Sequence, residues 1–263
     1  MILSCESIAK RIKREVKSDL AKLKSTPHLI SVQVGDSKEA TIYASAQKKI
    51  AKEVGIKYSS YHFKEISQKA LINFIQKLNK DSSVNGIIIH LPLPFHINAK
   101  SVFICLDIKK DVEGMHTQSN IIPCTPLAVM EILKEAKVRL RGKEVVIIGS
   151  SDCVGKPLLN LISDKMATLT ICNIATRNLL LHTQRADILI VAVGKPNFIK
   201  PEMVKEGVIV IDVGINRVGN EIVGDVDKKV GRKAKFLTPV PGGVGLITTA
   251  MLMKNSLICF RKQ

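Results

Sequence analysis

The sequence predicts an α/β protein of two domains, each built on a largely parallel sheet. Two observations lead to this prediction. First, apolar runs of strand length alternate with segments of helical periodicity along the 263 residues, an order typical of βαβ units. Second, runs such as Gly86–His90 and Glu144–Ile148 are almost continuously apolar, which favours parallel strands covered on both faces. The length is sufficient for two ordinary domains.

The first half of the chain predicts three helices and three strands. Ile8, Ile12 and Val16 recur at helical spacing. Gly35 ends an apolar run with a turn signal, and Gly55 has the position of a residue that closes a helix. The expected elements are a helix over 6–23, a strand over 29–34, a helix over 40–54, a strand over 58–63, a helix over 67–78 and a strand over 86–90.

The second half predicts a Rossmann-type sheet, because four apolar runs are separated by helix-length or shorter connections. The expected elements are a helix over 127–136, strands over 144–148, 168–172, 188–193 and 208–213, and a last helix over 246–259. We expect the last helix to return to the first domain. The predicted domains are residues 1–124 together with the helix 246–263, and residues 125–245.

Composition excludes several classes of protein. No apolar run reaches the roughly 18 residues that span a bilayer, and the polar N-terminus does not predict a secretory signal. The six cysteines are scattered without a C-x-x-C pair, which predicts reduced thiols in a cytoplasmic protein and no metal site. The net charge of +17 invites a nucleic-acid hypothesis. However, the lysines are spread along helix faces and few aromatic residues are present to stack on bases, so we expect a solvated basic surface.

A glycine-containing loop follows the predicted strand 144–148. Gly149, Ser150 and Ser151 open the loop, and Gly155 and Pro157 stand near the start of the next helix. A dinucleotide pyrophosphate binds at such a place, on backbone N–H groups at the positive end of a helix. Because Ser151 stands where a second glycine would be in the G-x-G-x-x-G pattern, a tight strand–helix turn explains the run equally well.

A second constrained loop spans 238–245 and contains two prolines and three glycines. The prolines fix φ, and the glycines allow close backbone approaches that a Cβ would prevent. We interpret Pro241, Gly242 and Gly243 as part of a rigid loop that lies against a flat ligand.

The 238–245 run also resembles the C-terminal signature of the bifunctional methylenetetrahydrofolate dehydrogenase/methenyltetrahydrofolate cyclohydrolase family. The runs 123–126, 211–216 and 223–226 are similar to family segments as well, and the resemblance covers nearly the entire chain in order. It implies a folate-binding catalytic domain, an NAD(P)-binding domain, tetrahydrofolate as substrate and NADP or NAD as cofactor. It also implies a cytoplasmic homodimer that acts in one-carbon metabolism and purine biosynthesis.

The resemblance assigns catalytic positions in the first domain to Tyr43, Gln47 and His90. Gln47 stands at the family's lysine, and His90 stands at the glutamine that bonds this lysine. Without the resemblance, Tyr43 and Gln47 would be ordinary helix surface, and the charged run 110–114 would be a solvated turn. Glu113 stands where the family has the aspartate that binds the pterin. The implied substrate-binding residues are Tyr43, Glu113, Pro241, Gly242 and Gly243.

The resemblance also assigns cofactor binding to Gly149, Ser150, Ser151, Ile174 and Ile215. Ser150 replaces a family arginine and Ile174 replaces a polar residue, both near the expected 2′-phosphate of NADP. The choice between NADP and NAD, and weak or absent cofactor binding, therefore stay open. Ile215 is expected beside the nicotinamide.

These replacements affect the two family reactions differently. Hydride transfer from methylene-tetrahydrofolate to the cofactor needs mainly alignment of two ring systems. Hydrolysis of the methenyl product needs a group that handles protons, and the amide of Gln47 has no titratable proton. Three hypotheses stay open: a dehydrogenase with little cyclohydrolase activity, a bifunctional enzyme in which His90 does the proton work, and a non-catalytic folate- or nucleotide-binding relative or regulatory subunit.

Overall fold

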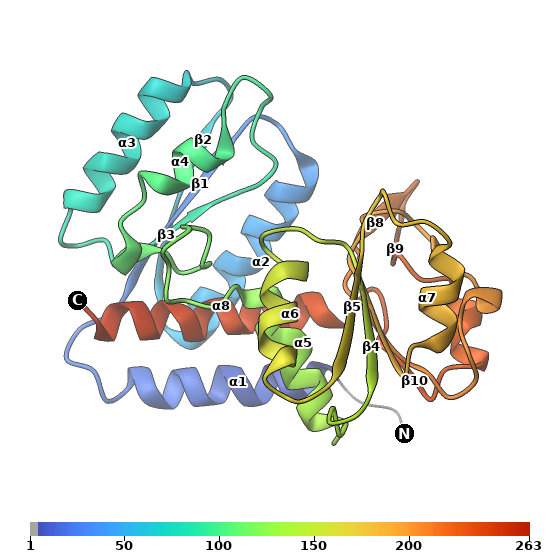
Figure 1. Ribbon diagram of the computed structural model, residues 1–263. Helices are drawn as coiled ribbons and strands as arrows, with labels where there is room; N and C mark the ends of the chain where they lie inside the picture. The colour runs from blue at the N-terminus through green and yellow to red at the C-terminus, as the bar shows by residue number, and fades with distance from the viewer. Residues whose placement is uncertain (1–4) are drawn as a thin grey trace. The chain divides into compact units, whose positions relative to one another are not determined.

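The computed structural model describes residues 5–263 and divides into two compact units. One unit combines residues 10–124 with 249–263, and the other combines residues 5–9 with 125–248. Each unit is an α/β structure with its own parallel sheet, as Figure 1 shows. The two-domain α/β prediction is therefore confirmed. Within residues 5–263, the longest apolar helices fall short of what a membrane crossing requires.

The unit that holds the N-terminal sheet has three parallel strands in the order β2-β1-β3. A helix connects each strand to the next one along the chain, as parallel strands require. The elements are α1 (Cys5–Leu20, whose first residues belong to the other unit), β1 (His28–Val34), α2 (Lys38–Val54), β2 (Lys57–Phe63), α3 (Gln68–Lys80), β3 (Gly86–Ile89), α4 (Ala99–Ile104) and the short 3₁₀ helix η1 (Ile108–Lys110).

The central strand β1 divides this unit into an apolar side and a polar side. Ile30 and Val32 point to one face and pack in a buried cluster with residues of α3 and α4. Successive side chains of a strand alternate between faces, so Ser31 and Gln33 point to the other face. Both are buried, and Gln33 bonds Thr41 of α2. The β1 strand thus places polar groups beneath α2.

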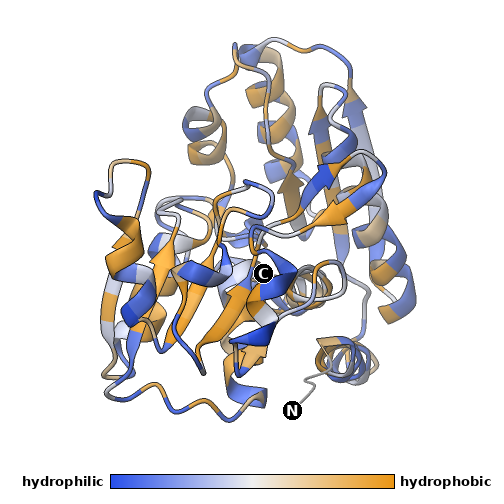
Figure 2. Cartoon of the chain, turned by 90° about the vertical axis from the view of Figure 1, so that its right-hand side faces the viewer, coloured by the Kyte–Doolittle hydropathy of each residue, from blue (hydrophilic) through white to orange (hydrophobic). Residues whose placement is uncertain are grey.

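The other unit contains a five-stranded sheet in the order β10-β7-β6-β4-β5, in which every pairing is parallel. Figure 2 shows its strands coloured as hydrophobic along most of their length, which reflects cover on both faces. The elements are α5 (Cys124–Glu135), β4 (Glu144–Ile148), α6 (Gly155–Ser163), β5 (Thr168–Cys172), α7 (Leu179–Arg185), β6 (Ile188–Val191), η2 (Pro201–Met203), β7 (Ile209–Asp212), the hairpin β8 (Asn216–Val218) and β9 (Glu221–Val223), η3 (Lys228–Arg232), β10 (Phe236–Leu237) and α8 (Val244–Arg261).

This strand order locates the position where a nucleotide is expected. If the strands are numbered in chain order within the unit, they lie in the order 2-1-3-4-5. The chain leaves the first strand, β4, toward one edge of the sheet and leaves the third strand, β6, toward the other edge. Ligands of open parallel sheets bind outside the carboxyl ends of the strands at such a reversal. The loop that begins at Gly149 follows β4 directly.

The C-terminal helix α8 belongs, from Thr249 onward, to the unit of the N-terminal sheet. Asn255 donates from Nδ2 to the carbonyls of Val112 and Ile122, at 3.1 and 3.0 Å. Gln263 donates to the carbonyl of Asn85. The prediction that the last helix returns to the first domain is confirmed.

Every helix and strand expected from the sequence is present, with ends shifted by a few residues. Four features were not expected from the sequence: α4, α7, the β8–β9 hairpin and β10. These elements are short: β10 has two residues and α4 has six. Such lengths hold less than two periods of a helical or strand pattern, so periodicity does not detect them.

The charged run 110–114 is not a solvated turn. Lys110 is only 6% exposed, and its Nζ donates to the carbonyls of Leu78, Asn79 and Asp81 at 2.9, 2.7 and 2.7 Å, which closes the C-terminus of α3. Asp111 is buried and accepts backbone N–H bonds from Met115 and His116. These two residues fix the segment that presents Glu113.

Replacing Lys110 with methionine should destabilise this unit, because three carbonyls at the end of α3 lose a charged donor. We expect a loss of about 2–4 kcal/mol in the free energy of unfolding, measured by urea denaturation. The matched control is Lys109→Met, since the Lys109 side chain is exposed and its loss should cost less than about 0.5 kcal/mol. Equal effects of the two changes would contradict this role of Lys110.

Candidate functional site

Four of the residues singled out in the sequence come together in the unit of the N-terminal sheet. Tyr43 and Gln47 lie one turn apart on α2, and His90 follows β3 directly. The rings of Tyr43 and His90 meet edge to face, with centroids 6.3 Å apart and planes at 89°. Tyr43 is also close enough to Gln47 and Glu113 for both to influence its pKa. The structure thus brings these four side chains close together.

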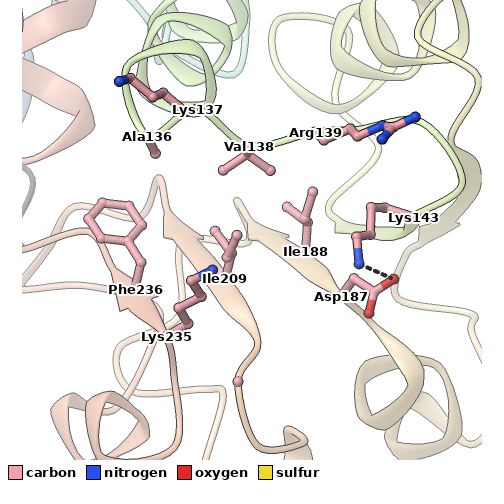
Figure 3. A pocket seen from close by; sticks show the side chains of 11 residues that line it. Ala136, Lys137, Val138, Arg139, Lys143, Asp187, Ile188, Ile209, Lys235 and Phe236 are labelled. Atoms are coloured by element: carbon pink, nitrogen blue, oxygen red, sulfur yellow. Dashed lines mark ion pairs between the residues drawn. The ribbon is translucent and has the colours of Figure 1, made fainter. Parts of the chain in front are cut away.

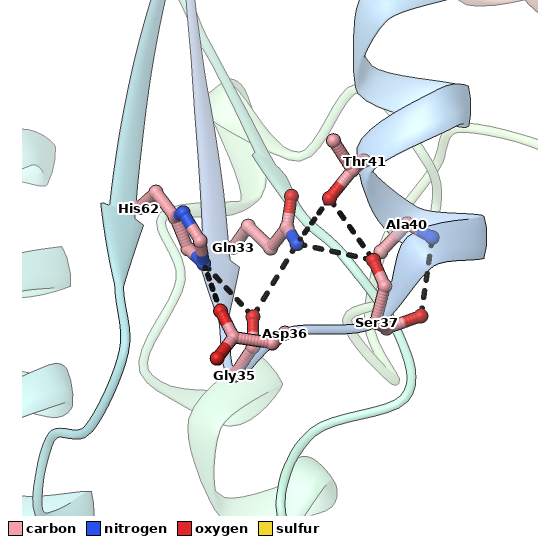
Figure 4. A network of polar contacts seen from close by, with 7 residues as sticks. All are labelled: Gln33, Gly35, Asp36, Ser37, Ala40, Thr41 and His62. Carbon is pink, nitrogen blue, oxygen red and sulfur yellow. Dashed lines mark hydrogen bonds and ion pairs between the residues drawn. The ribbon is translucent and has the colours of Figure 1, made fainter.

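The start of α2 is held in place by the polar side of β1, as Figure 4 shows. Ser37 caps the helix by accepting from the N–H of Ala40. Gln33 donates from Nε2 to Thr41 Oγ1 at 2.9 Å and to the carbonyls of Gly35 and Ser37 at 3.3 Å. At the other end, the left-handed conformation of Gly55 (φ 95°) closes the helix. The position of the α2 side chains relative to β1 is therefore well determined.

Gln47 is fully buried, with 0% of its surface exposed, so the interpretation as ordinary helix surface is wrong. Its Oε1 accepts a hydrogen bond of 2.9 Å from the hydroxyl of Tyr58, a residue of β2. Its Nε2 has no hydrogen-bond partner within 3.5 Å, and the Tyr43 hydroxyl, one turn earlier on α2, is near enough for the amide to lower the pKa of Tyr43. Burying an unpaired amide donor costs free energy, which a ligand acceptor at this point would recover.

His90 is 4% exposed, and its Nε2 lies 2.8 Å from the hydroxyl of Ser31. Burial lowers the pKa of His90 to about 4, because the charged imidazolium loses its hydration. The ring is therefore neutral near pH 7. A base of such low pKa takes up protons poorly from water at neutral pH.

Glu113 does not carry the charge expected from the sequence. Burial, with a smaller contribution from the nearby Asp111, raises the pKa of Glu113 to about 8. The carboxyl group thus holds its proton at neutral pH in the ligand-free protein. Burial also raises the pKa of Tyr43 well above its ordinary value, and Glu113 adds to this effect. A cluster of neutral polar groups results.

In the second unit, glycine is required at two places of the loop after β4. Gly149 has φ +110°, and a Cβ there would collide with the carbonyl of Ala192 after β6. A Cβ on Gly155 would collide with the carbonyl of Gly149. Val154 precedes α6 without any side-chain cap. Lys156 donates its N–H to the carbonyl of Ser151 and Pro157 has no N–H, so Gly155 is the residue that can offer a backbone donor at the start of this nine-residue helix. A turn this close and an uncapped helix start suit a pyrophosphate.

The remaining cofactor candidates lie at the carboxyl edge of the same sheet. Ser150 and Ser151 continue the loop after β4, Ile174 follows β5, and Ile215 follows β7. Ile174 is 94% exposed and Ile215 is 59% exposed, both unusual for large apolar side chains. Exposed apolar side chains at a ligand-binding edge are available to contact a nucleotide.

The proline–glycine loop belongs to this second unit too. Pro241 and Gly242 are exposed, and Gly242 has φ +96°. Gly243 is buried, and a Cβ there would collide with the carbonyl of Pro239. The loop is anchored at its start, where the hydroxyl of Thr238 accepts from the N–H of Asp212 at 2.7 Å. Its backbone is thus constrained at the positions singled out in the sequence.

Comparison with known proteins agrees with this geometry. The catalytic-domain model of the tetrahydrofolate dehydrogenase/cyclohydrolase family matches residues 3–113, and the NAD(P)-binding domain model matches residues 123–263. The bifunctional protein FolD of Fusobacterium nucleatum is 43% identical, over 99% of this chain and 98% of that protein. The chain belongs to the tetrahydrofolate dehydrogenase/cyclohydrolase family.

Two solved structures extend the comparison. The bifunctional enzyme FolD of Campylobacter jejuni is 41% identical, with a TM-score of 0.94 over 100% of this chain and 99% of that chain. The methylenetetrahydrofolate dehydrogenase-cyclohydrolase (FolD) of Trypanosoma brucei, complexed with NADP cofactor and inhibitor, is 31% identical, with a TM-score of 0.94 over 100% and 97%.

Sequence reasoning missed several residues that organise this tetrahydrofolate dehydrogenase/cyclohydrolase fold. Ser31 and Tyr58 bond His90 and Gln47. Asp225, fully buried, accepts from the backbone N–H groups of residues 193–195 and from Asn216, which holds the loop after β6. The available signal was a polar residue inside an otherwise apolar strand, as at Ser31.

A separate cavity of about 430 Å³ lies at the amino ends of the five-stranded sheet (Figure 3). Val138, Ile188 and Ile209 line it, and Lys143 pairs with Asp187 at its side across 4.0 Å. None of the site residues predicted from the sequence lines this cavity, and it faces away from the carboxyl edge where Gly149 lies. Among residues 5–263, no group of three or more histidine, cysteine or acidic side chains is placed to hold a metal ion.

The high pKa of Glu113 should make stability fall as the pH rises from 6.5 to 8. The folded state binds the proton of Glu113 more tightly than the unfolded state does. The resulting stabilisation is fully present below the ordinary pKa of 4.5 and is lost as the pH rises past 8. His90 has the opposite effect, because folding lowers its pKa from 6.5 to about 4. Its effect on the free energy of unfolding therefore lies mainly below pH 6.5. We expect a fall of up to about 2 kcal/mol in the free energy of unfolding across this interval.

Glu113→Gln should remove the fall in the free energy of unfolding between pH 6.5 and 8, as measured by urea denaturation at several pH values. Glu65→Gln, which changes an exposed carboxylate of the same unit, is the matched control and should leave the fall intact. If the fall persists in Glu113→Gln, the proton is not held at Glu113.

Proposed function

We propose that this protein is an NAD(P)-dependent methylenetetrahydrofolate dehydrogenase with little methenyltetrahydrofolate cyclohydrolase activity. Family membership supports the reaction type, and the relatives named above are described as bifunctional or as dehydrogenase-cyclohydrolases. The observation that carries the division between the two activities is the fully buried Gln47, an amide at the centre of the site. It offers hydrogen bonds but no titratable proton.

Substrate binding is assigned to Tyr43, Glu113 and the loop of Pro241, Gly242 and Gly243. Tyr43 offers an aromatic face, and Glu113 offers carboxyl oxygens that accept from donors on a pterin edge. The loop offers an exposed, constrained backbone against a flat ring. With these roles, residues 1–124 and the helix 246–263 form the folate-binding catalytic domain, and residues 125–245 form the NAD(P)-binding domain.

Cofactor binding is assigned to the carboxyl edge of the five-stranded sheet. The turn at Gly149 and the uncapped start of α6 fit a pyrophosphate, with Ser150 and Ser151 beside it. Ile215 is exposed on the same edge and is assigned to the nicotinamide end. A bound nicotinamide supplies the carbon that accepts the hydride, so the protein has only to hold the two rings in line.

Hydrolysis of the methenyl product places a different demand on the site, because a proton has to be moved beside the attacked carbon. Gln47 cannot do this. His90 is neutral, buried and bonded to Ser31, and its low pKa makes it a weak proton acceptor. These properties favour a dehydrogenase over a bifunctional enzyme that relies on His90, and no observation favours a non-catalytic relative.

Two finer assignments accompany this proposal. We propose that the protein acts as a cytoplasmic homodimer. The six cysteines are free, in agreement with a reducing compartment. Analytical ultracentrifugation at several concentrations tests the dimer directly.

Parallel assays on one preparation test the proposed function. NAD(P)H formation from methylene-tetrahydrofolate should be readily measurable, and the decay of methenyl-tetrahydrofolate should scarcely exceed the rate without enzyme. Hydrolysis as fast as hydride transfer would contradict the division of activities. Absence of both activities, together with no tetrahydrofolate binding at about millimolar concentration, would contradict the folate assignment.

Gln47→Lys should increase cyclohydrolase activity by at least about tenfold, because a positioned titratable group typically contributes more than that. The new side chain would replace a buried one that faces Tyr58, with the helix held by Gln33 and Gly55. Ala46→Lys adds the same charge one residue away at an exposed position and should give no increase. A folded, folate-binding Gln47→Lys variant without gain would contradict the assignment of this position.

Ser150→Arg should tighten NADP relative to NAD. A guanidinium beside the expected 2′-phosphate can form a bidentate contact that stabilises the complex by about 1.5–3 kcal/mol. Calorimetric titration with both cofactors measures the change. Ser163→Arg, at the far end of α6, adds the same charge at an exposed site and should not change the ratio. Equal tightening by both variants would point to general charge attraction and not to this loop.

A further inference from the structure

Four polar residues form a continuous chain on the polar side of the N-terminal sheet. The Nε2 of His90 lies 2.8 Å from Ser31 Oγ. Ser31 is placed to donate to the Tyr58 hydroxyl and so lowers the pKa of Tyr58, against the larger, opposite effect of burial. The Tyr58 hydroxyl donates to Gln47 Oε1 across 2.9 Å. The chain therefore runs His90–Ser31–Tyr58–Gln47 and ends at the Gln47 amide, whose Nε2 is unpaired.

The strand register explains why these residues meet. In the parallel pairing of β1 with β2, Leu29 lies opposite Tyr58 and Ser31 lies opposite Ser60. Paired residues share a face, and so do residues two apart on one strand. Ser31 and Tyr58 are therefore diagonal neighbours on one face, the face to which Gln33 and its α2 partner Thr41 also belong.

Proton counting then determines the direction of every bond in the chain. Each hydroxyl has one proton. Tyr58 gives its proton to Gln47, so Ser31 has to donate in the bond between the two hydroxyls. Ser31 then has no proton left for His90, and the Nε2–H of His90 has to be the donor. This direction leaves Nδ1 of the neutral His90 ring as an acceptor and the Gln47 amide Nε2 as a donor.

We propose that Ser31 and Tyr58 are positioning residues that orient the Gln47 amide, so that its Nε2–H₂ group donates a hydrogen bond to the substrate. The acceptor is a ring nitrogen lone pair or a carbonyl oxygen of a folate, which deepens the function proposed above and rests on it. If every hydrogen bond of the chain ran the other way, Oε1 of Gln47 would point toward the ligand and the His90 proton would be on Nδ1. The two directions thus present opposite hydrogen-bonding groups to the ligand.

The first experiment needs no substrate. Nitrogen-15 NMR of the histidine side chains, with His90 assigned through its loss in His90→Gln, determines which ring nitrogen is protonated. We expect the proton on Nε2 of His90 in the unmodified protein. Tyr61→Phe removes a tyrosine hydroxyl from the opposite face of β2, where Tyr61 packs on Phe74 of α3, and should leave this signal unchanged. A proton on Nδ1, or an equal mixture of the two tautomers, would overturn the proposal.

The second experiment tests whether Tyr58 acts through Gln47. Tyr58→Phe should lower kcat/KM for hydride transfer about tenfold, because the amide is no longer oriented. In a Gln47→Ala background the same change should alter kcat/KM less than twofold, since there is no amide left to orient. Equal fold-changes in the two backgrounds would overturn the proposal.

Ser31→Ala interrupts the hydrogen-bonded chain at a different residue. The proposal can therefore be tested even if Tyr58→Phe does not fold. It should lower kcat/KM in the same direction and shift the His90 tautomer signal. Ser59→Ala is the matched control, because Ser59 forms a Ser–His pair of the same 2.8 Å length with His28, outside this chain. If Ser31→Ala behaves like Ser59→Ala in both measurements, the proposal fails. Absent folate turnover in the unmodified protein would instead contradict the proposed function, and the tautomer result would stand by itself.

Discussion

The arrangement of the catalytic unit depends on the pairing of buried polar side chains on one face of the N-terminal sheet. An unpaired buried polar group costs roughly 1–3 kcal/mol, so such groups are stable only in fixed partnerships. Gln33 pairs with the start of α2, and Ser31 pairs with His90. The bonds of Gln33 place the helix that carries Tyr43 and Gln47, while the opposite face of the sheet packs on α3 and α4 through apolar contacts. One strand, β1, therefore serves both the core and the site.

The same constraint shapes the chemistry. Burial makes charge expensive, so His90 is neutral with a pKa of about 4 and Glu113 is neutral with a pKa of about 8. A site of neutral hydrogen-bonding groups can orient a flat ligand and exclude water. It is poorly suited to moving protons. Alignment without proton transfer is what hydride transfer between two ring systems requires, and this agreement underlies the proposed division between the two family activities.

In the nucleotide unit, backbone geometry has the role that side-chain pairing has in the catalytic unit. Gly149 allows the loop after β4 to approach the loop after β6, and Gly155 allows α6 to begin directly against Gly149. Asp225 then fixes the N–H groups of residues 193–195, and Asp212 accepts from the N–H groups of Gly214 and Val226. The carboxyl edge of the sheet is thus rigid before a ligand arrives, which reduces the entropy lost on binding.

The sequence predicted the two sheets and most elements, because strands such as β4 and helices such as α2 are long enough to show their period. It also identified Tyr43, Gln47, His90 and Glu113 as neighbours through resemblance. It did not reveal the bonds of Ser31 and Tyr58, because these depend on the register of two strands. Nor did it reveal that Glu113 is protonated, since a pKa follows from burial in three dimensions. Short elements such as β10 escaped for lack of a full period.

The central claim is that this site transfers hydride without completing hydrolysis. A single-turnover experiment tests it most directly: excess enzyme is mixed with methylene-tetrahydrofolate and cofactor, and the methenyl and formyl products are followed in time. We predict that methenyl-tetrahydrofolate accumulates to nearly one equivalent of the hydride transferred and then decays at the rate seen without enzyme. Formation of formyl-tetrahydrofolate in step with NAD(P)H, without methenyl accumulation, would contradict the account.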